Sequence, residues 1–468
     1  MDAEIIKMNR KLYIQNQINR FLDATVIDTI INDLKIFNSN LQKSSDLRAL
    51  LNTISKEIDI RIKNKTDVID DCIDLDAAQI SYVLLGNYEL LEKYNIEQLK
   101  MIVSHVKKVI KIIEENGQNL EQKLFHNCSS VPNIIHQTVP ISKDENENKI
   151  IFCSSEQNQE IRENLIKTFL TNDDLFNPVT YKYSHYELLE KLDFVDCNNG
   201  IKISGNRGYF LKGLGVKLNL ALLTFATDFL VSRGFTLMET PEFVNGDLLS
   251  KCSQLSDYED MLYKLEGYDK YLIATSEQSL TASFADTILE IKDLPQKLGG
   301  LSTCFRKETG CEGKNTNGIY RVHQFKKVEQ FCVTKPEESW NMFNEMINNS
   351  KDFYDALGIS YRVVNIVSGA LNNAAAMKYD LEAWYPGSKS WCKLVSGTNC
   401  TDYFSKRMNT KVERGVNYFY PHMLNSTLCA NTRTLCCLVE CYQTTNGIVV
   451  PEVLRPFMND IDFIPFAK

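Results

Sequence analysis

The chain lacks the features that would direct it into a membrane or out of the cell. It contains no apolar run near the roughly 18 residues that a helix needs to cross a bilayer, so we expect no contact with a membrane. The N-terminal segment Met1–Lys11 is acidic at once and has neither the apolar core of a secretory signal nor the Arg-rich composition of a transit peptide. A cytoplasmic location is the default expectation.

The chain also lacks closely paired cysteines. Its 14 Cys residues are scattered, and none forms a Cys-x-x-Cys pair. Without a signal peptide, this distribution is more typical of reduced core thiols than of disulfides. The cluster Cys429, Cys436, Cys437 and Cys441 leaves zinc as an alternative, but its spacing fits no zinc template and its surroundings are apolar and helix-like. We therefore expect these thiols to belong to a core.

Composition and charge are those of an ordinary globular protein. Of 468 residues, 44% are hydrophobic and 24% are charged, which argues against disorder over most of the chain. The length allows roughly two to four domains. The net charge of −8 argues against a generally adhesive nucleic-acid binder, but it permits a local basic patch.

Up to about residue 135 the chain is poor in Gly and Pro and shows two stretches of heptad periodicity. Their apolar positions are Leu47, Leu51, Ile54, Ile58 and Ile62, and then Leu99, Ile102, Val106, Val109 and Ile113. Alternating steps of four and three mark a coiled-coil seam. The stretches flank the acidic segment Asp67–Asp76, so residues 1–135 are predicted to form an antiparallel helical hairpin, locally weak at Asn116 and Gly117.

Basic residues flank both seams. They are Lys56, Arg61, Lys63 and Lys65 on the first stretch, and Lys107, Lys108 and Lys111 on the second. One interpretation is a solvated helix surface. The other is a face that contacts RNA phosphates, although many acidic neighbours weaken it.

The composition of the chain and its predicted secondary structure change after the hairpin. Residues 127–150 contain two prolines and many polar residues, as a linker does. Beyond them, short β-rich runs such as Tyr271–Ala274 and Gly447–Val450 mix with helical stretches such as Val216–Val231. The predicted fold class is therefore α+β, with residues 136–200 as the linker and approach to a large domain over residues 201–468.

The segment Cys304–Phe331 carries the densest set of candidate binding groups. Its ends are strand-like and its middle is a Gly-rich loop. Arg306 and Glu308 are two apart and Phe325 and Glu329 are four apart, so each pair projects from one face of its strand. An arginine fork suits a phosphate or carboxylate, an aromatic face suits a nucleobase, and a carboxylate suits an ammonium. Alone, such a hairpin is equally compatible with a salt-bridged surface.

This segment resembles motif 2 of class II aminoacyl-tRNA synthetases, in the form found in seryl-tRNA synthetases of eukaryotic type. Other segments match that family in the expected order. They are Val131–Pro140 (the linker after the coiled coil), Gly205–Gly213 (the start of the catalytic domain), Gly234–Pro241 (motif 1, at the dimer interface), Thr275–Glu277 (the serine-binding TxE) and Leu424–Glu440 (motif 3). The resemblance spans almost the whole chain. It implies a class II catalytic domain built on an antiparallel β-sheet flanked by helices.

The resemblance also implies roles for the matching residues. The catalytic residues are Arg306, Glu308 and Arg433. The ATP-binding residues are Arg306, Glu308, Val322, Phe325, Lys393, Leu394, Val395, Ser396 and Arg433. The serine-binding residues are Thr275, Ser276, Glu277, Arg306, Glu329, Asn425 and Thr427. In the family pattern, Arg306 holds the α-phosphate and the serine carboxylate, while Phe325 and Arg433 cover the two faces of the adenine.

The implied activity is that of a serine–tRNA ligase, which activates L-serine with ATP to seryl-adenylate and transfers it to tRNA(Ser). The serine carboxylate is already a nucleophile, so the enzyme mainly has to position it and stabilise charge on the phosphoryl oxygens. The implied partners are ATP, L-serine, tRNA(Ser) bound through the helical hairpin, and a second copy of the chain in a homodimer.

One position departs from the family pattern. The family has Glu-Leu-Val-Ser, whose glutamate and serine hold a Mg²⁺ that bridges ATP phosphates, where this chain has Lys393–Ser396. A charged lysine cannot ligate Mg²⁺, so Mg²⁺ is expected, its usual site is altered, and Ser396 is the remaining candidate ligand. Either the chain is a catalytically impaired relative that binds tRNA or protein partners, or Lys393 neutralises the phosphates itself. We favour the second interpretation because the other matched site residues are present.

Overall fold

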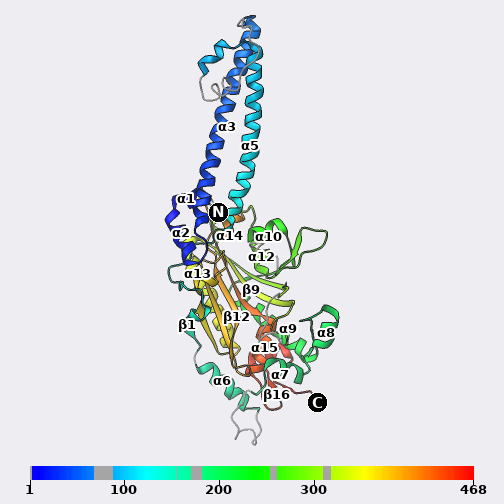
Figure 1. Cartoon of the computed structure of the whole chain (residues 1–468). Helices are drawn as coiled ribbons and strands as arrows, with labels where there is room; N and C mark the ends of the chain where they lie inside the picture. Colours follow the sequence, from blue (N-terminus) through cyan, green and yellow to red (C-terminus); the bar gives the residue numbers. More distant parts are fainter. Residues whose placement is uncertain are drawn as a thin grey trace. The chain divides into compact units, whose positions relative to one another are not determined.

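The computed structural model describes residues 3–67, 88–154, 156–169, 182–252, 261–308 and 318–467 of the chain. They form two compact units, coloured along the sequence in Figure 1. The first unit comprises Met1–Ile18 and Asp23–Val131, and the second comprises Asn19–Leu22 and Pro132–Lys468. The acidic connection beyond Asp67 and the Gly-rich middle of the candidate motif 2 (309–317) lie outside the described residues.

Two long helices lie side by side in the first unit (Figure 1). The helices of this unit are α1 (Ala3–Met8), α2 (Arg10–Asn19), α3 (Thr25–Asn64), the 3-10 helix η1 (Tyr88–Lys93) and α5 (Ile96–Ser130). Lys123 pairs with Asp33, whereas Glu114, earlier in α5, pairs with Arg48, later in α3. The two helices are therefore antiparallel, and the predicted helical hairpin is confirmed.

The apolar seam of the hairpin follows the predicted heptads except at its end. Five of the predicted positions are buried, namely Leu47, which is 9% exposed, and Ile54, Leu99, Ile102 and Val106, which are 0% exposed. Ile62 is 55% exposed and lies outside the seam, so that part of the prediction is wrong. Its neighbour Arg61 is buried instead, because its guanidinium pairs with Glu57 and donates to the backbone oxygens of Leu91 and Tyr94.

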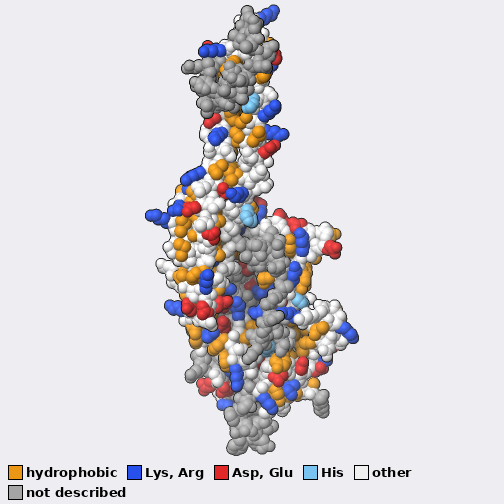
Figure 2. Space-filling model, in the orientation of Figure 1, with side chains coloured by type: hydrophobic (Ala, Val, Ile, Leu, Met, Phe, Trp, Pro, Cys, Tyr) orange, Lys and Arg blue, Asp and Glu red, His pale blue; other side chains and the backbone are white. Residues whose placement is uncertain are grey.

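Arg61 therefore leaves the set of candidate RNA contacts. The other predicted basic residues of the hairpin are exposed, namely Lys56, Lys63, Lys65, Lys107, Lys108 and Lys111. On the face shown in Figure 2, Lys and Arg side chains are interspersed with Asp and Glu along the helices. Helix α5 continues unbroken through Gly117.

The second unit is built on an eight-stranded sheet in the order β1-β10-β11-β12-β15-β9-β8-β4. The strands are β1 (Lys149–Cys153), β4 (Thr236–Glu239), β8 (Gln296–Phe305), β9 (Gln324–Thr334), β10 (Tyr361–Asn365), β11 (Met377–Tyr385), β12 (Ser390–Asn399) and β15 (His422–Ala430). All neighbours pair antiparallel except β4 and β8, which run parallel. The predicted α+β class is confirmed.

Shorter elements complete the second unit. Its helices are α6 (Glu156–Lys167), α7 (His185–Lys191), α8 (Cys197–Ser204), α9 (Gly213–Ser232), α10 (Gly246–Cys252), α12 (Ser276–Ala282), α13 (Ser339–Ala356), α14 (Tyr403–Arg407) and α15 (Asn431–Cys441). Its small strands are β2 (Val195–Asp196), β3 (Phe210–Leu211), β5 (Phe243–Asn245), β6 (Lys270–Leu272), β7 (Ile288–Glu290), β13 (Lys411–Arg414), β14 (Asn417–Phe419), β16 (Gly447–Val449) and β17 (Phe463–Pro465).

Two glycines of β8 show how helices cover both faces of the sheet. A Cβ at Gly299 would lie 3.1 Å from the side chain of Leu230 on α9, and one at Gly300 would lie 2.5 Å from Oγ of Ser276 on α12. Because successive strand residues point to opposite faces, α9 covers one face and α12 the other. Helix α13 shares the α9 face, since Phe353 stacks on Phe225 at 5.3 Å.

The segment that the sequence presents as a linker is built into the second unit. Helix α5 continues to Ser130, so the first residues of 127–150 are helical. Beyond it, the side-chain amide of Asn133 donates to the backbone oxygens of Ala374 and Cys400, and Val139 is buried in the main core. A polar composition with prolines indicated a loop correctly, but not that the loop is anchored.

The cysteine cluster on motif 3 is fully buried. Cys429, Cys436, Cys437 and Cys441 are free thiols in the main core. Within the described residues, no group of three or more Cys, His, Asp or Glu side chains could hold a metal ion. Their burial supports the core interpretation.

Helix α9 is the one described helix that is long and apolar enough to cross a membrane by length and composition alone. Its buried residues include Leu218, Leu222, Ala226 and Leu230. The polar residues Lys217, Asn219 and Asp228 interrupt its apolar run. Core helices of globular proteins pass the same test, and α9 packs against the sheet.

Candidate active site

A cavity of about 260 Å³ opens in the second unit, on the part of the sheet formed by β9, β11, β12 and β15. Most of the predicted site residues line it, namely Thr275, Glu277, Arg306, Glu308, Val322, Phe325, Glu329, Lys393, Leu394, Val395, Ser396, Asn425, Thr427 and Arg433. Of the predicted residues, only Ser276 lies outside this lining. Its side chain is fully buried, with Oγ 3.5 Å from the backbone oxygen of Gly300.

Arg306 and Glu308 reach the cavity by a different route from the one predicted. Strand β8 ends at Phe305, so the two residues follow the strand and the alternation argument does not apply to them. Glu308 has a φ of 49°, which turns the chain, and its carboxylate accepts from Arg321 at 3.3 Å. Both side chains line the same cavity, and the backbone N–H of Arg306 donates to the backbone oxygen of His323 at 2.9 Å.

An arginine and an aromatic ring form one side of the cavity. The Arg306 guanidinium lies 5.3 Å from the centre of the Phe325 ring. Phe325 is on β9 opposite Cys304 of β8, so antiparallel pairing fixes this neighbourhood. The exposed ring face and the adjacent cation suit a planar base attached to a phosphate.

A small polar pocket surrounds Glu329, which is 3% exposed. Its Oε1 accepts hydrogen bonds from the hydroxyls of Thr275 and Thr427, each at 3.2 Å. Lys327, two residues earlier on β9, forms an ion pair with the same oxygen. Burial lowers the pKa of Lys327 to about 8. A buried carboxylate with hydroxyl neighbours suits a small ligand that carries an ammonium and a hydroxyl group.

A second carboxylate closes the same pocket. Oε1 of Glu277 accepts from Nδ2 of Asn425 at 2.6 Å. Burial raises the pKa of Glu277 to about 7, an effect opposed by the positive charges of Lys327 and Arg306. Thr275 caps the N-terminus of α12 through the backbone N–H of Glu277, which fixes the start of this helix against the pocket.

A β-bulge in β12 brings Lys393 and Ser396 to the same cavity. Glu382 of β11 pairs with Lys393 and Leu381 pairs with Val395, which leaves Leu394 as an extra residue. In a regular strand, residues three apart point to opposite faces. The inserted residue shifts the alternation, so both side chains line the cavity.

The resemblance implies a Mg²⁺ ion beside Lys393 and Ser396, but the side chains present do not fit one. Nζ of Lys393 lies 2.8 Å from Oδ2 of Asp380, whose side chain is only 4% exposed. The neighbouring carboxylate is therefore already paired with an ammonium, and a charged ammonium cannot ligate a metal. Ser396 alone leaves too few protein oxygens for the ion at this position.

Arg433 projects into the cavity from α15. Its guanidinium lies 4.9 Å from the centre of the Tyr320 ring, and Nη1 donates to the backbone oxygen of Lys393 at 3.4 Å. Its own backbone oxygen accepts from the hydroxyl of Tyr385 at 2.7 Å. Contacts with Tyr320, Tyr385 and the backbone oxygen of Lys393 therefore hold Arg433. The family resemblance assigns this arginine to ATP binding.

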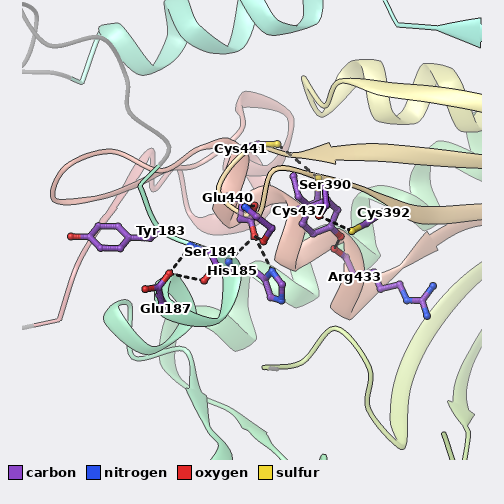
Figure 3. Close-up of polar contacts among 12 residues, drawn as sticks. Tyr183, Ser184, His185, Glu187, Ser390, Cys392, Arg433, Cys437, Glu440 and Cys441 are labelled. Atoms are coloured by element: carbon purple, nitrogen blue, oxygen red, sulfur yellow. Dashed lines mark hydrogen bonds and ion pairs between the residues drawn. The ribbon is translucent and has the colours of Figure 1, made fainter. Parts of the chain in front are cut away.

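Two turns further along α15, Glu440 lies in a buried polar cluster (Figure 3). Its side chain is 0% exposed. Nδ1 and the backbone N–H of His185 each donate to Oε1 at 2.8 Å. The hydroxyl and the backbone N–H of Ser388 donate to Oε1 and Oε2 at 2.5 and 2.9 Å. Glu440 therefore links α15 to α7 and to the turn between β11 and β12.

Several cavity residues were not predicted from the sequence. They are Met261, Ala274, Tyr320, Arg321, Lys327, Asn372, Lys378, Thr398, Ala430 and Thr432. Lys327 could have been found, because it is two residues from both Phe325 and Glu329 on one strand and so shares their face. Lys378 could not, because β11 pairs with β12 only in the folded sheet.

The cavity is positively charged overall. Its lining has six cationic side chains, Arg306, Arg321, Lys327, Lys378, Lys393 and Arg433, and three anionic ones, Glu277, Glu308 and Glu329. The carboxylates Glu277 and Glu329 belong to the small polar pocket, whereas Lys393 and Arg433 lie on β12 and α15. The arrangement suits a polyanion beside a small zwitterion.

The comparisons with known proteins agree with this chemistry. A family model described as the tRNA synthetase class II core domain (G, H, P, S and T) matches residues 263–442. The chain is 42% identical over 457 residues to the cytoplasmic serine–tRNA ligase of Dictyostelium discoideum, covering 93% of this chain and 95% of that protein. It is 38% identical over 502 residues to that of Cricetulus griseus, covering 100% and 92%.

Two solved structures match over the whole chain. One is the cytoplasmic serine–tRNA ligase of Naegleria fowleri in complex with AMP, with a TM-score of 0.85, 40% identity and coverage of 100% of this chain and 99% of that chain. The other is the seryl-tRNA synthetase of Pyrococcus horikoshii complexed with ATP, with a TM-score of 0.83, 33% identity and full coverage of both chains. These matches confirm the predicted class II fold, with a helical hairpin preceding the sheet domain.

Proposed function

The chain belongs to the serine–tRNA ligase family of class II aminoacyl-tRNA synthetases, and we propose on this basis that it activates L-serine with ATP and transfers the seryl group to tRNA(Ser). The observation that carries the proposal is the arrangement of one cavity. It joins an arginine–aromatic pair, Arg306 and Phe325, to a buried pocket of carboxylates and hydroxyls around Glu329.

The first step needs positioning more than proton transfer. A serine carboxylate oxygen attacks the α-phosphorus of ATP, and the bond to the β-phosphate oxygen breaks, releasing pyrophosphate. We assign Arg306 to the α-phosphate and the serine carboxylate, because its fork can hold two anionic oxygens while they react. Arg433, from the opposite side of the cavity, balances the charge of the leaving phosphates.

We assign the adenine to the Phe325 ring, with Arg433 on the other face, Glu308 at the base edge and Val322 offering backbone contacts. Leu394 and Val395 contribute the wall formed by β12. Arg321 holds the Glu308 carboxylate at 3.3 Å, and a carboxylate has enough lone pairs to accept a further donor from the base.

We assign serine to the pocket formed by Thr275, Glu277, Glu329, Asn425 and Thr427. The carboxylates receive the serine ammonium and the polar groups receive its hydroxyl. Alanine would leave those buried groups without a partner, and sites that bind a hydroxyl in this way reject analogues lacking it strongly. Ser276 faces Gly300 instead, so its proposed contribution is to hold α12 in place.

The partners and location follow from the same family membership. We propose that tRNA(Ser) binds along the helical hairpin and that the cytoplasm is the site of action, as the names of the relatives state for those proteins. We also propose a homodimer formed through β4 and α9. All four residues of the edge strand β4 are exposed, and Leu220 and Val231 of α9 are each 53% exposed, so a covering partner would bury apolar surface.

The test is serine-dependent exchange of pyrophosphate into ATP by the full-length protein. We expect exchange with serine and at least a hundredfold less with alanine. The alternative of a catalytically impaired relative predicts no exchange at any magnesium concentration, with activity restored by Lys393→Glu. That result would overturn the proposed activity while leaving tRNA binding to be measured separately.

A further inference from the structure

We propose that Lys393, held by Asp380, supplies the fixed positive charge that faces the ATP phosphates in this chain, so that ATP binding does not depend on a protein-bound Mg²⁺ at this position. This inference rests on the proposed function and concerns how the same site holds ATP. The side chains at this position do not suit the metal ion that the family resemblance implies.

The ion pair with Asp380 fixes the position of the Lys393 ammonium and leaves it open to the cavity. Asp380 is 4% exposed, whereas the Lys393 side chain is 41% exposed and lines the cavity. An ammonium has three N–H donors, and the contact with one carboxylate oxygen leaves donors for a ligand. The carboxylate therefore acts as an anchor, and the charge that remains open to the cavity is positive.

A second lysine strengthens the positive field at the same carboxylate. Nζ of Lys378 lies 4.0 Å from Oδ1 of Asp380, and Lys378 also lines the cavity. Burial lowers the pKa of Lys378, opposed mainly by the negative charge of Asp380. One buried carboxylate thus faces two ammonium groups, and together they present a net positive charge.

The position of Lys393 relative to Arg433 directs this charge toward the phosphates. Arg433 donates to the backbone oxygen of Lys393 at 3.4 Å, so the two cations come from adjoining points of β12 and α15. A Mg²⁺ with one glutamate carries the same net charge as a single ammonium. The replacement therefore keeps the charge opposite the polyanion while removing the need for a metal ligand.

A purely structural role for the ion pair would have different consequences. Loss of such a pair would lower the stability of the sheet and leave ligand affinity unchanged once the protein is folded. The experiment must therefore measure binding directly, on folded protein and without turnover. Lys212 offers a matched control, since it pairs with Asp193 at 2.7 Å and is 43% exposed, but it does not line the cavity.

The test measures ATP binding to the full-length protein by calorimetry, once with excess Mg²⁺ and once with EDTA. We expect the Kd of the unmodified protein for ATP to change by less than about threefold between the two conditions. Lys393→Met should weaken ATP binding in EDTA by at least tenfold, which corresponds to the loss of a single charged contact. Lys393→Glu should make ATP binding depend on Mg²⁺ by at least tenfold, and Lys212→Met should behave like the unmodified protein.

Two results would overturn the inference. One is a loss of tenfold or more in ATP affinity when EDTA replaces Mg²⁺ in the unmodified protein. The other is unchanged ATP affinity in folded Lys393→Met, as judged by its thermal unfolding. If Lys393→Met does not fold, Lys393→Glu decides the question by whether Mg²⁺ dependence appears. Absence of pyrophosphate exchange would instead count against the proposed function, because none of these binding measurements requires the reaction.

Discussion

The buried carboxylate of Glu440 gives the sharpest test of how the site is held together. Glu440→Gln keeps the shape of the side chain and replaces one oxygen by an NH₂ group. If the remaining amide oxygen takes the place of Oε1, it keeps the three contacts from His185 and the Ser388 hydroxyl. The new NH₂ then faces the backbone N–H of Ser388, which donates to Oε2 in the present structure.

The cost can be estimated from these contacts. A buried N–H that loses its acceptor costs about 1–3 kcal/mol, and hydrogen bonds to a charged group are worth about 1 kcal/mol more than neutral ones. Glutamine is neutral, so the variant no longer has to bury a charge, and this offsets part of the cost in free energy. We therefore expect a loss of about 2–4 kcal/mol in the free energy of unfolding, which is large compared with the ~5–15 kcal/mol of a typical domain.

Tryptophan fluorescence during urea unfolding is a suitable assay. Trp340, Trp384 and Trp391 are the only tryptophans of the chain, and all belong to the second unit. The rings of Trp384 and Trp391 are 5.3 Å apart on the two strands that flank the turn containing Ser388. For an m-value of about 3 kcal/mol/M, the expected loss lowers the urea midpoint by about 1 M.

Glu187 provides the matched control. Its carboxylate accepts from the backbone N–H and the hydroxyl of Ser184, but glutamine serves equally well in such a capping box. Glu187→Gln should therefore change the stability by less than about 0.5 kcal/mol. Equal midpoints for Glu440→Gln and the unmodified protein, or equal losses for both variants, would show that the Glu440 contacts do not support the site as described.

Three further predictions follow from the site and the hairpin. The pKa of Glu277 is raised to about 7, so acidification below pH 7 should neutralise it and raise the KM for serine in the exchange assay, a dependence that Glu277→Gln should abolish. Arg306→Lys should lower exchange by about 10²–10³-fold, because an ammonium cannot hold two oxygens in parallel. Replacing residues 45–113 by a short Gly-rich turn that joins Ser44 to Glu114, whose side chains lie 3.4 Å apart, should abolish tRNA charging and preserve exchange.

Periodicity predicted the hairpin well because its cause is local. A heptad pattern buries the same side of each helix whatever else the chain does, and Leu47, Ile54 and Ile102 are buried as expected. The failures occur where a polar side chain finds a tertiary partner. Arg61 was expected at the surface with its basic neighbours, yet two backbone oxygens before α5 draw it inside.

The active-site residues were named through the family resemblance, and residue patterns alone would not have assembled them. Periodicity correctly placed Phe325 and Glu329 on one face of β9. It placed Arg306 and Glu308 in a strand that in fact ends before them. The period of a strand does not extend to residues beyond its end, and Glu308 has a φ of 49°.

The bulge at Leu394 shows why the region around Lys393 could not be read from the sequence. Strict alternation would send Lys393 and Ser396 to opposite faces of β12, away from a common ligand. A bulge depends on how two strands pair, and no residue within 393–396 indicates it. Asp380 is likewise 13 positions away in the chain, on the strand that the bulge faces. The anchor for Lys393 and the face on which it acts therefore exist only in the folded sheet, so a change that regularised β12 should displace Lys393 even with every side chain retained.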